Sequence, residues 1–374
     1  MRRLTGLRKT CYQGTVLSPS EVEVLTKLER LLGRSIPQIV QIDIDRPLTQ
    51  VFLQLEVYKK EHSNPCFGIT IEQNQVTGLA LDSPLRKSKL VSGGLAHRRY
   101  RLDTSSAFPP FPEYIGKLTN LRVLSLRESQ LAEVPTFLNQ LTQLQELDLS
   151  ANQLTSLSKN FGQLTSLKKL KLQNNRFSSL PESLSQLKGL QALDVSNKDP
   201  FSETGFRMTR IHWIPRYFTQ NRLESLPESL GQLRGLQALD VSNNKITSLP
   251  ETIGRLDHLT SLNLAGNRLE ALPTSFSQLK NLQRLNLSDN PLSQLSLSNM
   301  VSLFRPSENN VKILGYNPFR ICGHPLVKPL DRRTISITNQ VTCPLCGASE
   351  VLTGQDDQTG QERYICPQCE NIIK

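Results

Sequence analysis

Leucines recur at a fixed spacing through the middle of the chain, and most residues between them are polar. The phrase is clearest where it reads LQALDVSNNKITSLP, from Leu236, and LTSLNLAGNRLEALP, from Leu259. Every step is 23 residues except the step from Leu190 to Leu236, which is 46 residues or two periods. The pattern predicts eight equivalent units stacked in a row, seven of which keep the first leucine. Those leucines are Leu121, Leu144, Leu167, Leu190, Leu236, Leu259 and Leu282.

The spacing inside one unit predicts a short strand followed by a tight turn. The second and third leucine positions, such as Leu239 and Val241, alternate with outward positions, which is the period of a half-buried strand. Parallel stacking of these strands would give one continuous core. A buried asparagine amide needs hydrogen-bond partners, so we expect the asparagine at the ninth position to bond the backbone of neighbouring turns. That asparagine recurs at Asn152, Asn175, Asn221, Asn244, Asn267 and Asn290.

Most units end with a leucine–proline or valine–proline pair, as at Leu226-Pro227. The proline turns the chain away from the strand. Segments that follow it, such as ESLGQL and ETIGRL, are predicted to form about one helical turn each on the convex side.

The 23-residue period and the L-P-x-x-h-x-x-L tail resemble the intracellular, Ras-group type of leucine-rich repeat. This resemblance implies an α/β solenoid, a horseshoe with short parallel strands on its concave face, and a role in protein interaction. It leaves the partner open, because arrays of this kind bind many things. A small GTPase is possible by the family resemblance. Some relatives carry a GTPase on the same chain, but this sequence has no G-x-x-x-x-G-K-[ST] phosphate loop.

The chain before the repeats follows other patterns. Ser18 and Glu21 form a capping box around a proline, leucines at helical spacing follow, and Gly33 is placed to end the helix. The alternation over residues 68–81 predicts a β-hairpin that turns at Asn74. We interpret this region as a cap, because the first repeat would otherwise expose one side of its apolar core.

The predicted divisions follow from these changes of pattern. A degenerate first repeat near Arg98 keeps only its second half. The divisions are a flexible start at 1–17, an N-terminal cap with one helix and a hairpin or degenerate repeat at 18–97, leucine-rich repeats at 98–295 (degenerate at 198–219), a C-terminal cap and linker at 296–340, and a zinc ribbon at 341–374.

Recognition residues should lie between the strand leucines, on the predicted concave face. The row is mostly small and polar, with a lysine pair flanked by acidic residues, and this mixed sign favours a protein over phosphate groups. The plainer alternative is a solvated face whose residues merely pair across repeats. The candidate partner-binding residues are Arg127, Glu146, Asp148, Lys169, Lys171, Asp194, Tyr217, Asp240, Asn263 and Arg284.

Between Asn197 and Asn221, one unit lacks the leucine motif but keeps the 23-residue length. Its flanks, 175–197 and 221–243, are near duplicates that agree at 19 of 23 positions. We interpret 198–219 as a degenerate repeat that still supplies a damaged fifth strand. The alternative is a functional insertion that carries a basic and aromatic cluster suited to binding, including Arg210, Trp213 and Tyr217.

Two C-P-x-C pairs near the C-terminus predict one zinc ion, with 19 residues between the pairs. Two such turns facing one another give tetrahedral thiolate ligation, and four cysteines leave no position for water, so the zinc would be structural. Short strands are expected at 351–353 and 363–365, which resembles the generic four-cysteine ribbon family. The predicted ligands are Cys343, Cys346, Cys366 and Cys369.

The net charge of +11 raises the question of nucleic acid. Divided by region, the excess is about +4 before residue 98, +2 over 98–120, +4 over 121–300 and +1 afterwards. We interpret this diffuse excess as a solvated surface, and keep nucleic-acid binding through the zinc ribbon and the basic surface as the alternative function.

The remaining classes are disfavoured by motifs that do not occur. No catalytic residues are predicted, since the five histidines form no H-x-x-x-H pair and there is no G-x-S-x-G. No apolar run approaches the length of a membrane span, so no membrane partner is expected. Paired cysteines that suit a metal favour a reducing cytoplasm.

Overall fold

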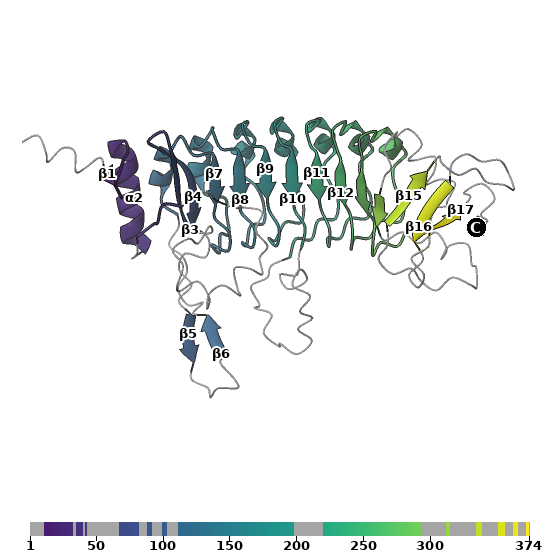
Figure 1. Cartoon of the computed structure of the whole chain (residues 1–374), viewed down its shortest axis with the longest axis horizontal. Coiled ribbons are helices and arrows are strands. Elements are labelled where there is room, and N and C mark those ends of the chain that lie inside the picture. The colour runs from purple at the N-terminus through teal and green to yellow at the C-terminus, as the bar shows by residue number, and fades with distance from the viewer. Residues whose placement is uncertain are drawn as a thin grey trace, which may run out of the picture. The chain divides into compact units, whose positions relative to one another are not determined.

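The computed structural model describes the repeats and parts of the flanking regions. Among the described residues, those up to Arg176 belong to one compact unit and those from Phe177 onward to a second. Figure 1 traces the elements of both units. The described residues are 11–32, 35–39, 42, 67–81, 88–91, 99–102, 111–197, 220–292, 312–314, 334–338, 351–355, 362–365 and 372–373.

The first unit begins with a small hairpin and a helix. Strands β1 (Cys11–Tyr12) and β2 (Thr15–Val16) pair antiparallel, and helix α2 follows (Pro19–Leu32). The predicted capping box is present, because the Ser18 amide donates to Glu21 Oε2 at 3.1 Å and the Glu21 amide donates to Ser18 Oγ at 3.3 Å. The other oxygen of Glu21 accepts the Val76 amide at 2.9 Å, which ties the helix to the next element.

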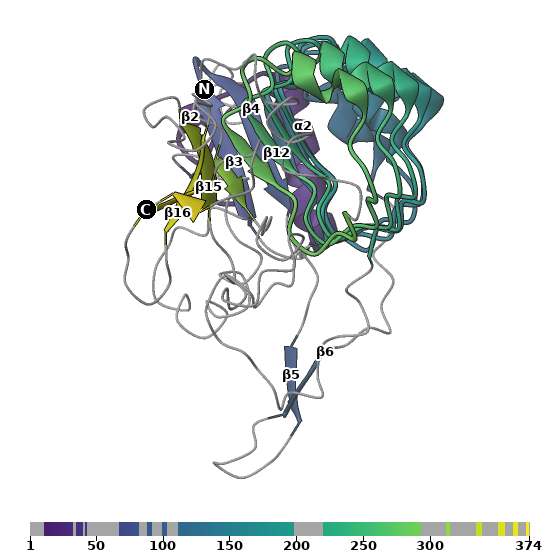
Figure 2. The same ribbon diagram turned by 90° about the vertical axis from the view of Figure 1, so that its right-hand side faces the viewer.

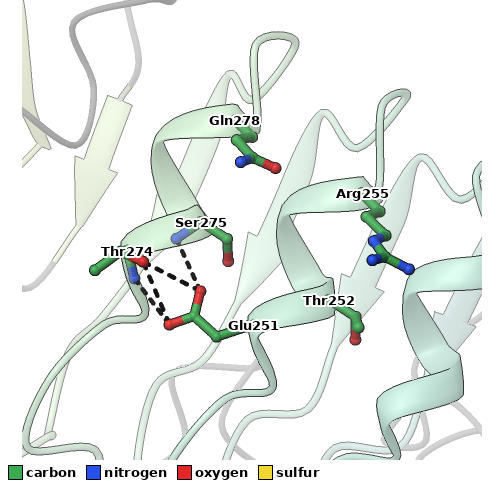
Figure 3. Close-up of a pocket in the computed structure, with 6 residues that line it drawn as sticks. All are labelled: Glu251, Thr252, Arg255, Thr274, Ser275 and Gln278. Atoms are coloured by element: carbon green, nitrogen blue, oxygen red, sulfur yellow. Dashed lines mark hydrogen bonds between the residues drawn. The ribbon is translucent and has the colours of Figure 1, made fainter.

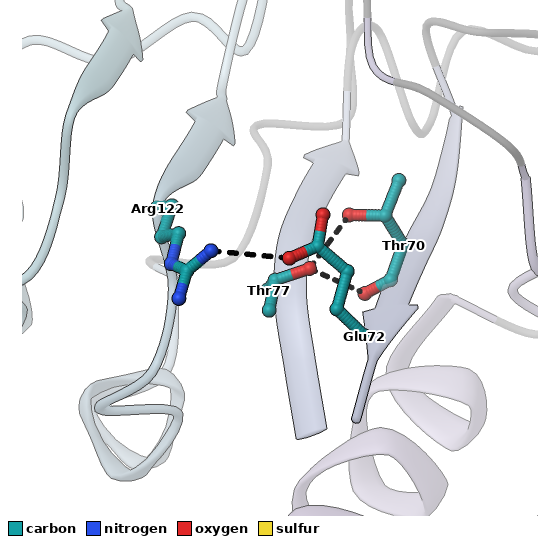
Figure 4. A network of polar contacts seen from close by, with 4 residues as sticks. All are labelled: Thr70, Glu72, Thr77 and Arg122. Atoms are coloured by element: carbon teal, nitrogen blue, oxygen red, sulfur yellow. Dashed lines mark hydrogen bonds and ion pairs between the residues drawn. The ribbon is translucent and has the colours of Figure 1, made fainter. Parts of the chain in front are cut away.

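That element is the predicted hairpin, formed by β3 (Phe67–Glu72) and β4 (Gln75–Leu81). Gln73 and Asn74 take φ values of 48° and 61° in the turn, the left-handed pair that suits a two-residue hairpin loop. Strand β4 pairs in parallel with β7 (Val123–Ser125), so it supplies the first strand beside the repeats. An exposed ion pair between Arg122 and Glu72, at 3.1 Å, spans the same junction (Figure 4).

The degenerate first repeat therefore takes its strand from β4. Strand β6 (Arg99–Leu102), near the predicted start, pairs instead with β5 (Ser88–Val91) in a separate two-stranded sheet. The retained second half is visible as the 3-10 helix η2 (Glu113–Lys117), which follows Pro112.

The repeats of the first unit match the predicted pattern. Strand β7 pairs in parallel with β8 (Glu146–Asp148), and β8 with β9 (Lys169–Lys171), always in steps of 23 residues. One helical turn closes each unit, as in η3 (Thr136–Gln140) and η4 (Lys159–Gln163). The strand leucines are fully buried, and aromatic rings fill the space under the turns. Examples are Leu124, Leu147, Leu170, Phe137 and Phe161.

The described repeats of the second unit follow the same plan, with four strands and four helical turns. The turns lie on the opposite side of each repeat from the strands (Figure 2), and each begins after a proline that fixes φ, such as Pro227 at −67°. The strands are β10 (Ala192–Asp194), β11 (Ala238–Asp240), β12 (Ser261–Asn263) and β13 (Arg284–Asn286). The helical turns are η5 (Glu182–Gln186), η7 (Glu228–Gln232), η8 (Glu251–Arg255) and η9 (Thr274–Gln278).

Beyond the repeats the strands change direction. Strand β14 (Lys312–Leu314) continues the parallel order beside β13, and the strands after it pair antiparallel with their predecessors. These are β15 (Thr334–Thr338), β16 (Val351–Gln355), β17 (Glu362–Ile365) and β18 (Ile372–Ile373).

The predicted damaged fifth strand is not part of the array, and this prediction was wrong. Strand β10 pairs directly with β11, so Leu193 faces Leu239 across 46 residues of sequence. The rest of the repeat skips the same stretch, since the Arg222 amide donates to the Phe177 carbonyl at 2.6 Å. In the described array, β10 and β11 are therefore direct neighbours, and Asn197 lies beside Asn221.

The two ends of this excursion are bonded to each other. The Asn221 amide donates to Asn197 Oδ1 at 2.7 Å, and Asn197 Nδ2 donates to the Asn221 carbonyl at 2.8 Å. Asn221 also takes the ninth position of the repeat that begins at Leu190, where it accepts the Phe177 amide at 3.0 Å. Counting nine positions along the sequence from Leu190 gives Lys198 instead.

The predicted asparagine ladder is confirmed. Asn175 is fully buried, and its Nδ2 donates to the carbonyls of Leu149 and Leu172 at 3.0 and 3.1 Å. Its Oδ1 accepts the Leu154 amide of the preceding turn at 3.0 Å. Asn152, Asn244 and Asn267 repeat this pattern with their own neighbours. One side chain per repeat thus satisfies backbone groups of two turns.

Glycine sets the approach of neighbouring helical turns in the second unit. A Cβ at Gly231 would lie 2.3 Å from the Thr252 carbonyl oxygen, and a Cβ at Gly254 would meet the Ser275 oxygen at the same distance. Because backbone cannot move aside as a flexible side chain can, we expect Gly231→Ala to lower the free energy of unfolding by roughly 1–3 kcal/mol. Chemical denaturation would measure it.

Gly235→Ala is the matched control for that substitution. A Cβ at Gly235 would come no closer than 3.5 Å to the Lys188 carbonyl oxygen, an ordinary contact. Its stability should therefore change little. Equal losses in the two variants would show that close packing at Gly231 is not the cause.

Candidate interaction surface

The outer sheet face is formed by the residues that alternate with the buried strand leucines. In the second unit they stand in register as two rows along β10 to β13. All are half-buried except Arg284, which is exposed. The first row is Ala192, Ala238, Ser261 and Arg284, and the second is Asp194, Asp240, Asn263 and Asn286.

The second row also holds its own turns in place. Asp240 Oδ1 accepts the amide and the hydroxyl of Ser242 at 3.0 and 2.7 Å, and Asp194 does the same for Ser196 at 3.0 and 2.6 Å. These carboxylates therefore have a structural role beside any role in recognition. The repeated D-x-S spacing in the sequence is the signal that could have shown it.

The outer face of the first unit carries alternating charge. The register places Glu146 opposite Lys169 and Asp148 opposite Lys171, pairings of opposite sign that stabilise neighbouring strands. The two lysines and Glu146 are half-buried, whereas Asp148 is 1% exposed and Arg127 is 4% exposed. The predicted recognition set in this unit is thus reduced to the three more accessible residues, because a partner cannot reach the buried pair.

The remaining predicted site residues lie outside the described part of the chain. Tyr217 is one, and the four cysteines of the predicted zinc ribbon are the others. The two short strands expected between the cysteine pairs are present as β16 and β17, which pair antiparallel. Within the ranges that the structure describes, no three histidine, cysteine or acidic residues gather as a metal site.

A groove between two helical turns was not predicted (Figure 3). It has a volume of about 310 Å³ and lies between η8 and η9. Glu251 is central, because its carboxylate accepts the Ser275 amide at 3.0 Å and the Thr274 amide at 3.3 Å. The lining residues are Glu251, Thr252, Arg255, Thr274, Ser275 and Gln278.

These bonds give the groove a structural explanation. The hydrogen bond from the Ser275 amide is the main reason that the pKa of Glu251 is lowered from its ordinary value of 4.5. The same contact joins other repeats, as Glu182 accepts the Ser229 amide at 3.2 Å. A glutamate after the proline of one repeat thus caps the helical turn of the next, a signal present in the sequence as P-E followed one repeat later by serine or threonine.

The described residues include no helix long and apolar enough to cross a membrane.

Comparison with known proteins identifies the repeats. The family model described as a leucine-rich repeat region matches residues 111–212 and 214–303. No curated protein matches the chain.

Two solved structures are similar over about half of this chain. A leucine-rich repeat protein of Leptospira interrogans shares 30% identity with a TM-score of 0.40, over 56% of this chain and 54% of that one. A chain of the Toll–Spatzle complex of Drosophila shares 22% identity with a TM-score of 0.42, over 53% of this chain and 26% of that one. This chain therefore spans about half or less of these proteins. Because both TM-scores are low, the assignment rests on the family model.

Proposed function

Because the chain belongs to the leucine-rich repeat family, we propose that it is a non-enzymatic binding protein that holds a protein partner on its outer sheet face. The observation that carries this proposal is the strict register of β10 to β13. Register turns single side chains into continuous rows, and small residues in those rows leave backbone and polar groups within reach of a partner.

The chemistry of the face supports a protein partner over a phosphate chain. In the second unit, the second row of the outer sheet face consists of acidic and amide residues. In the first unit, acidic and basic residues alternate along this face. Phosphate binding needs several cations together, which neither row offers. Mixed polar surfaces of this kind are typical of protein interfaces that form and dissociate.

The proposal also covers the kind of partner and the cellular compartment of the protein. A small GTPase is one candidate, by resemblance to the Ras-group repeats. We propose a cytoplasmic protein on the basis of its cysteine pairs, which suit metal binding in a reducing compartment.

A bulky substitution on the outer sheet face tests the function. Ser261→Arg places a long cation in the first row of β12, where the native residue is half-buried. Ser179→Arg makes the same change at an exposed position before Leu180, away from the strands. Proteins captured by the wild-type chain under crosslinking should be lost with Ser261→Arg and kept with Ser179→Arg. Capture that is unaffected by both substitutions would argue against binding on this face.

We further propose one structural zinc ion held by Cys343, Cys346, Cys366 and Cys369. The antiparallel pair β16 and β17 lies between the two cysteine pairs in the sequence, which suits the two facing turns of a ribbon. When bound, the metal would supply folding free energy to a segment too small to fold on its apolar content alone.

The zinc proposal predicts about one zinc ion per chain in protein purified under reducing conditions. Cys343→Ser should lower that content, because it removes one of four ligands. Cys322→Ser is the control, as this cysteine has no paired neighbour. Elemental analysis of both variants measures the effect, and a wild-type chain without zinc would refute the proposal.

A further inference from the structure

A concentrated basic segment of the sequence includes the two strands β5 and β6, which pair in the first unit (Figure 1). From Ser83 to Leu102 the sequence contains no acidic residue. Its six basic residues are Arg86, Lys87, Lys89, Arg98, Arg99 and Arg101. Residue 98 separates Arg86, Lys87 and Lys89 from the other three, so no single region of the chain has a net charge that shows how concentrated the six are.

The register arranges the strand residues into two kinds of face. Lys89 pairs with Arg101, and Val91 pairs with Arg99. Since alternate strand positions share a face, positions 89, 91, 99 and 101 lie on one side of the ribbon. Positions 88, 90, 100 and 102 lie on the other, and there the sequence has serine, leucine, tyrosine and leucine. The ribbon therefore has a basic face and a mostly apolar face.

A bound anion would stabilise the basic face. Like charges directly opposite one another destabilise a strand pair, and Lys89 opposite Arg101 is such a pair. A bound polyanion would remove that repulsion. A stretch with six basic residues and no acidic one also concentrates positive charge, as a diffuse net charge does not.

We propose that the β5–β6 ribbon binds double-stranded DNA through the phosphates, with Lys89, Arg99 and Arg101 on the contacting face. This function goes beyond partner binding by the repeats. The major groove of B-form DNA admits a two-stranded β-ribbon, whereas that of duplex RNA is too narrow. Cations supply the affinity by releasing counterions from the phosphates, without reading sequence.

Two other occupants fit the ribbon less well. The cores of protein interfaces are depleted of charged residues, so a face with three cations among its four positions is atypical of them. A membrane surface would have to take the apolar face as well. An isolated two-stranded hairpin is marginal in water, so we expect the apolar face to be covered by protein and not to be available to lipid.

The test measures affinity for a random-sequence DNA duplex at several salt concentrations, using the full chain. A triple variant, K89Q with R99Q and R101Q, removes three charges from the ribbon. The matched control, K159Q with K168Q and R176Q, removes three exposed charges elsewhere in the same unit. The ribbon variant should reduce the slope of log K against log salt by about 2–3, at about 0.9 per lost phosphate contact. The control variant should retain the wild-type slope.

A conservative variant, K89R with R99K and R101K, should keep the wild-type slope, which separates lost charge from lost folding. Several results would overturn the proposal: no binding by the wild-type chain, equal losses in the ribbon and control variants, or equal affinity for duplex RNA. Binding to phosphatidylglycerol vesicles or to polyglutamate with higher affinity than to DNA would equally reject it.

Discussion

A chain that lacks Lys198–Gln220 is expected to fold and to unfold at a higher temperature than the full chain. The register of β10 with β11 already bypasses this stretch, and its two ends are hydrogen-bonded through Asn197 and Asn221. Joining them would give LQALDVSNNRLESLP, which is nearly the phrase LQALDVSNNKITSLP that begins at Leu236. The deletion therefore restores an intact repeat without moving any neighbour.

The expected gain in stability comes from the entropy that the full chain loses when it closes this loop on folding. Closing a loop of about 23 residues costs roughly 2–3 kcal/mol of chain entropy, which the shortened chain no longer loses on folding. For a repeat array of this size, that corresponds to an increase of several degrees in melting temperature. Calorimetry of the two chains would measure it.

A deletion of equal length, Asn221–Asn243, is the control. It also keeps the 23-residue phase, but it removes a genuine unit with buried Leu230, Leu236 and Leu239. Since a solenoid loses both the unit and one stacking interface, its melting temperature should fall. If the loss of Lys198–Gln220 lowered stability as much as this control, those residues would have to belong to the stacked core.

The spacing of the leucines could not reveal this excursion. Its 23 residues are as many as one period, so counting phases gives the same answer for a degenerate repeat and for an added segment. Only the pairing of Leu193 with Leu239 distinguishes the two, and pairing between strands depends on tertiary contacts. The flanks are near duplicates in sequence, but this duplication is compatible both with a degenerate repeat and with an added segment.

Predictions based on local rules were confirmed where the rule acts between residues close together in the sequence. The capping box at Ser18, the hairpin turn at Asn74 and the strand at Leu239 all follow from residue type and spacing. Contacts between repeats were harder to foresee. The ladder of buried asparagines was expected because a buried amide demands partners, but the acceptor of the Ser275 amide is Glu251, an exposed residue whose carboxylate water could solvate instead.

For the candidate surface too, local features could be predicted from the sequence and tertiary features could not. The sequence identified which positions alternate with the leucines, and the register of β10 to β13 confirms that they form rows. It could not indicate that Arg127 and Asp148 are buried, because burial depends on what covers the face. It also assigned Asp240 to recognition alone, although its carboxylate holds the turn at Ser242.

Replacing Asn244 with alanine should cause one of the largest losses of stability available to a single substitution in this chain. Its Oδ1 accepts the Leu223 amide at 3.1 Å, and its Nδ2 donates to the carbonyls of Val195 and Val241, both at 3.0 Å. Asn244 is 7% exposed, so water cannot readily replace these bonds. Buried groups left without partners should lower the free energy of unfolding by roughly 2–5 kcal/mol.

Asn281→Ala is the matched control for this loss. Asn281 also donates to a carbonyl, that of Asp257 at 2.6 Å, but it is exposed, so water can take over the bond. Its stability should change by well under 1 kcal/mol, or about the net value of a single exposed hydrogen bond. The contrast between the two variants isolates burial, because the residue removed and the residue introduced are the same.

Hydrogen exchange locates the damage within the repeat. In Asn244→Ala the Leu223 amide loses its acceptor, so it should exchange faster than in the wild-type chain even under conditions where the rest of the array stays folded. The Ile246 amide has a separate acceptor, Asn267 Oδ1 at 3.1 Å, and should keep more of its protection. Unchanged exchange at Leu223, or equal stability losses for Asn244→Ala and Asn281→Ala, would mean that the ladder does not stabilise the stacked turns.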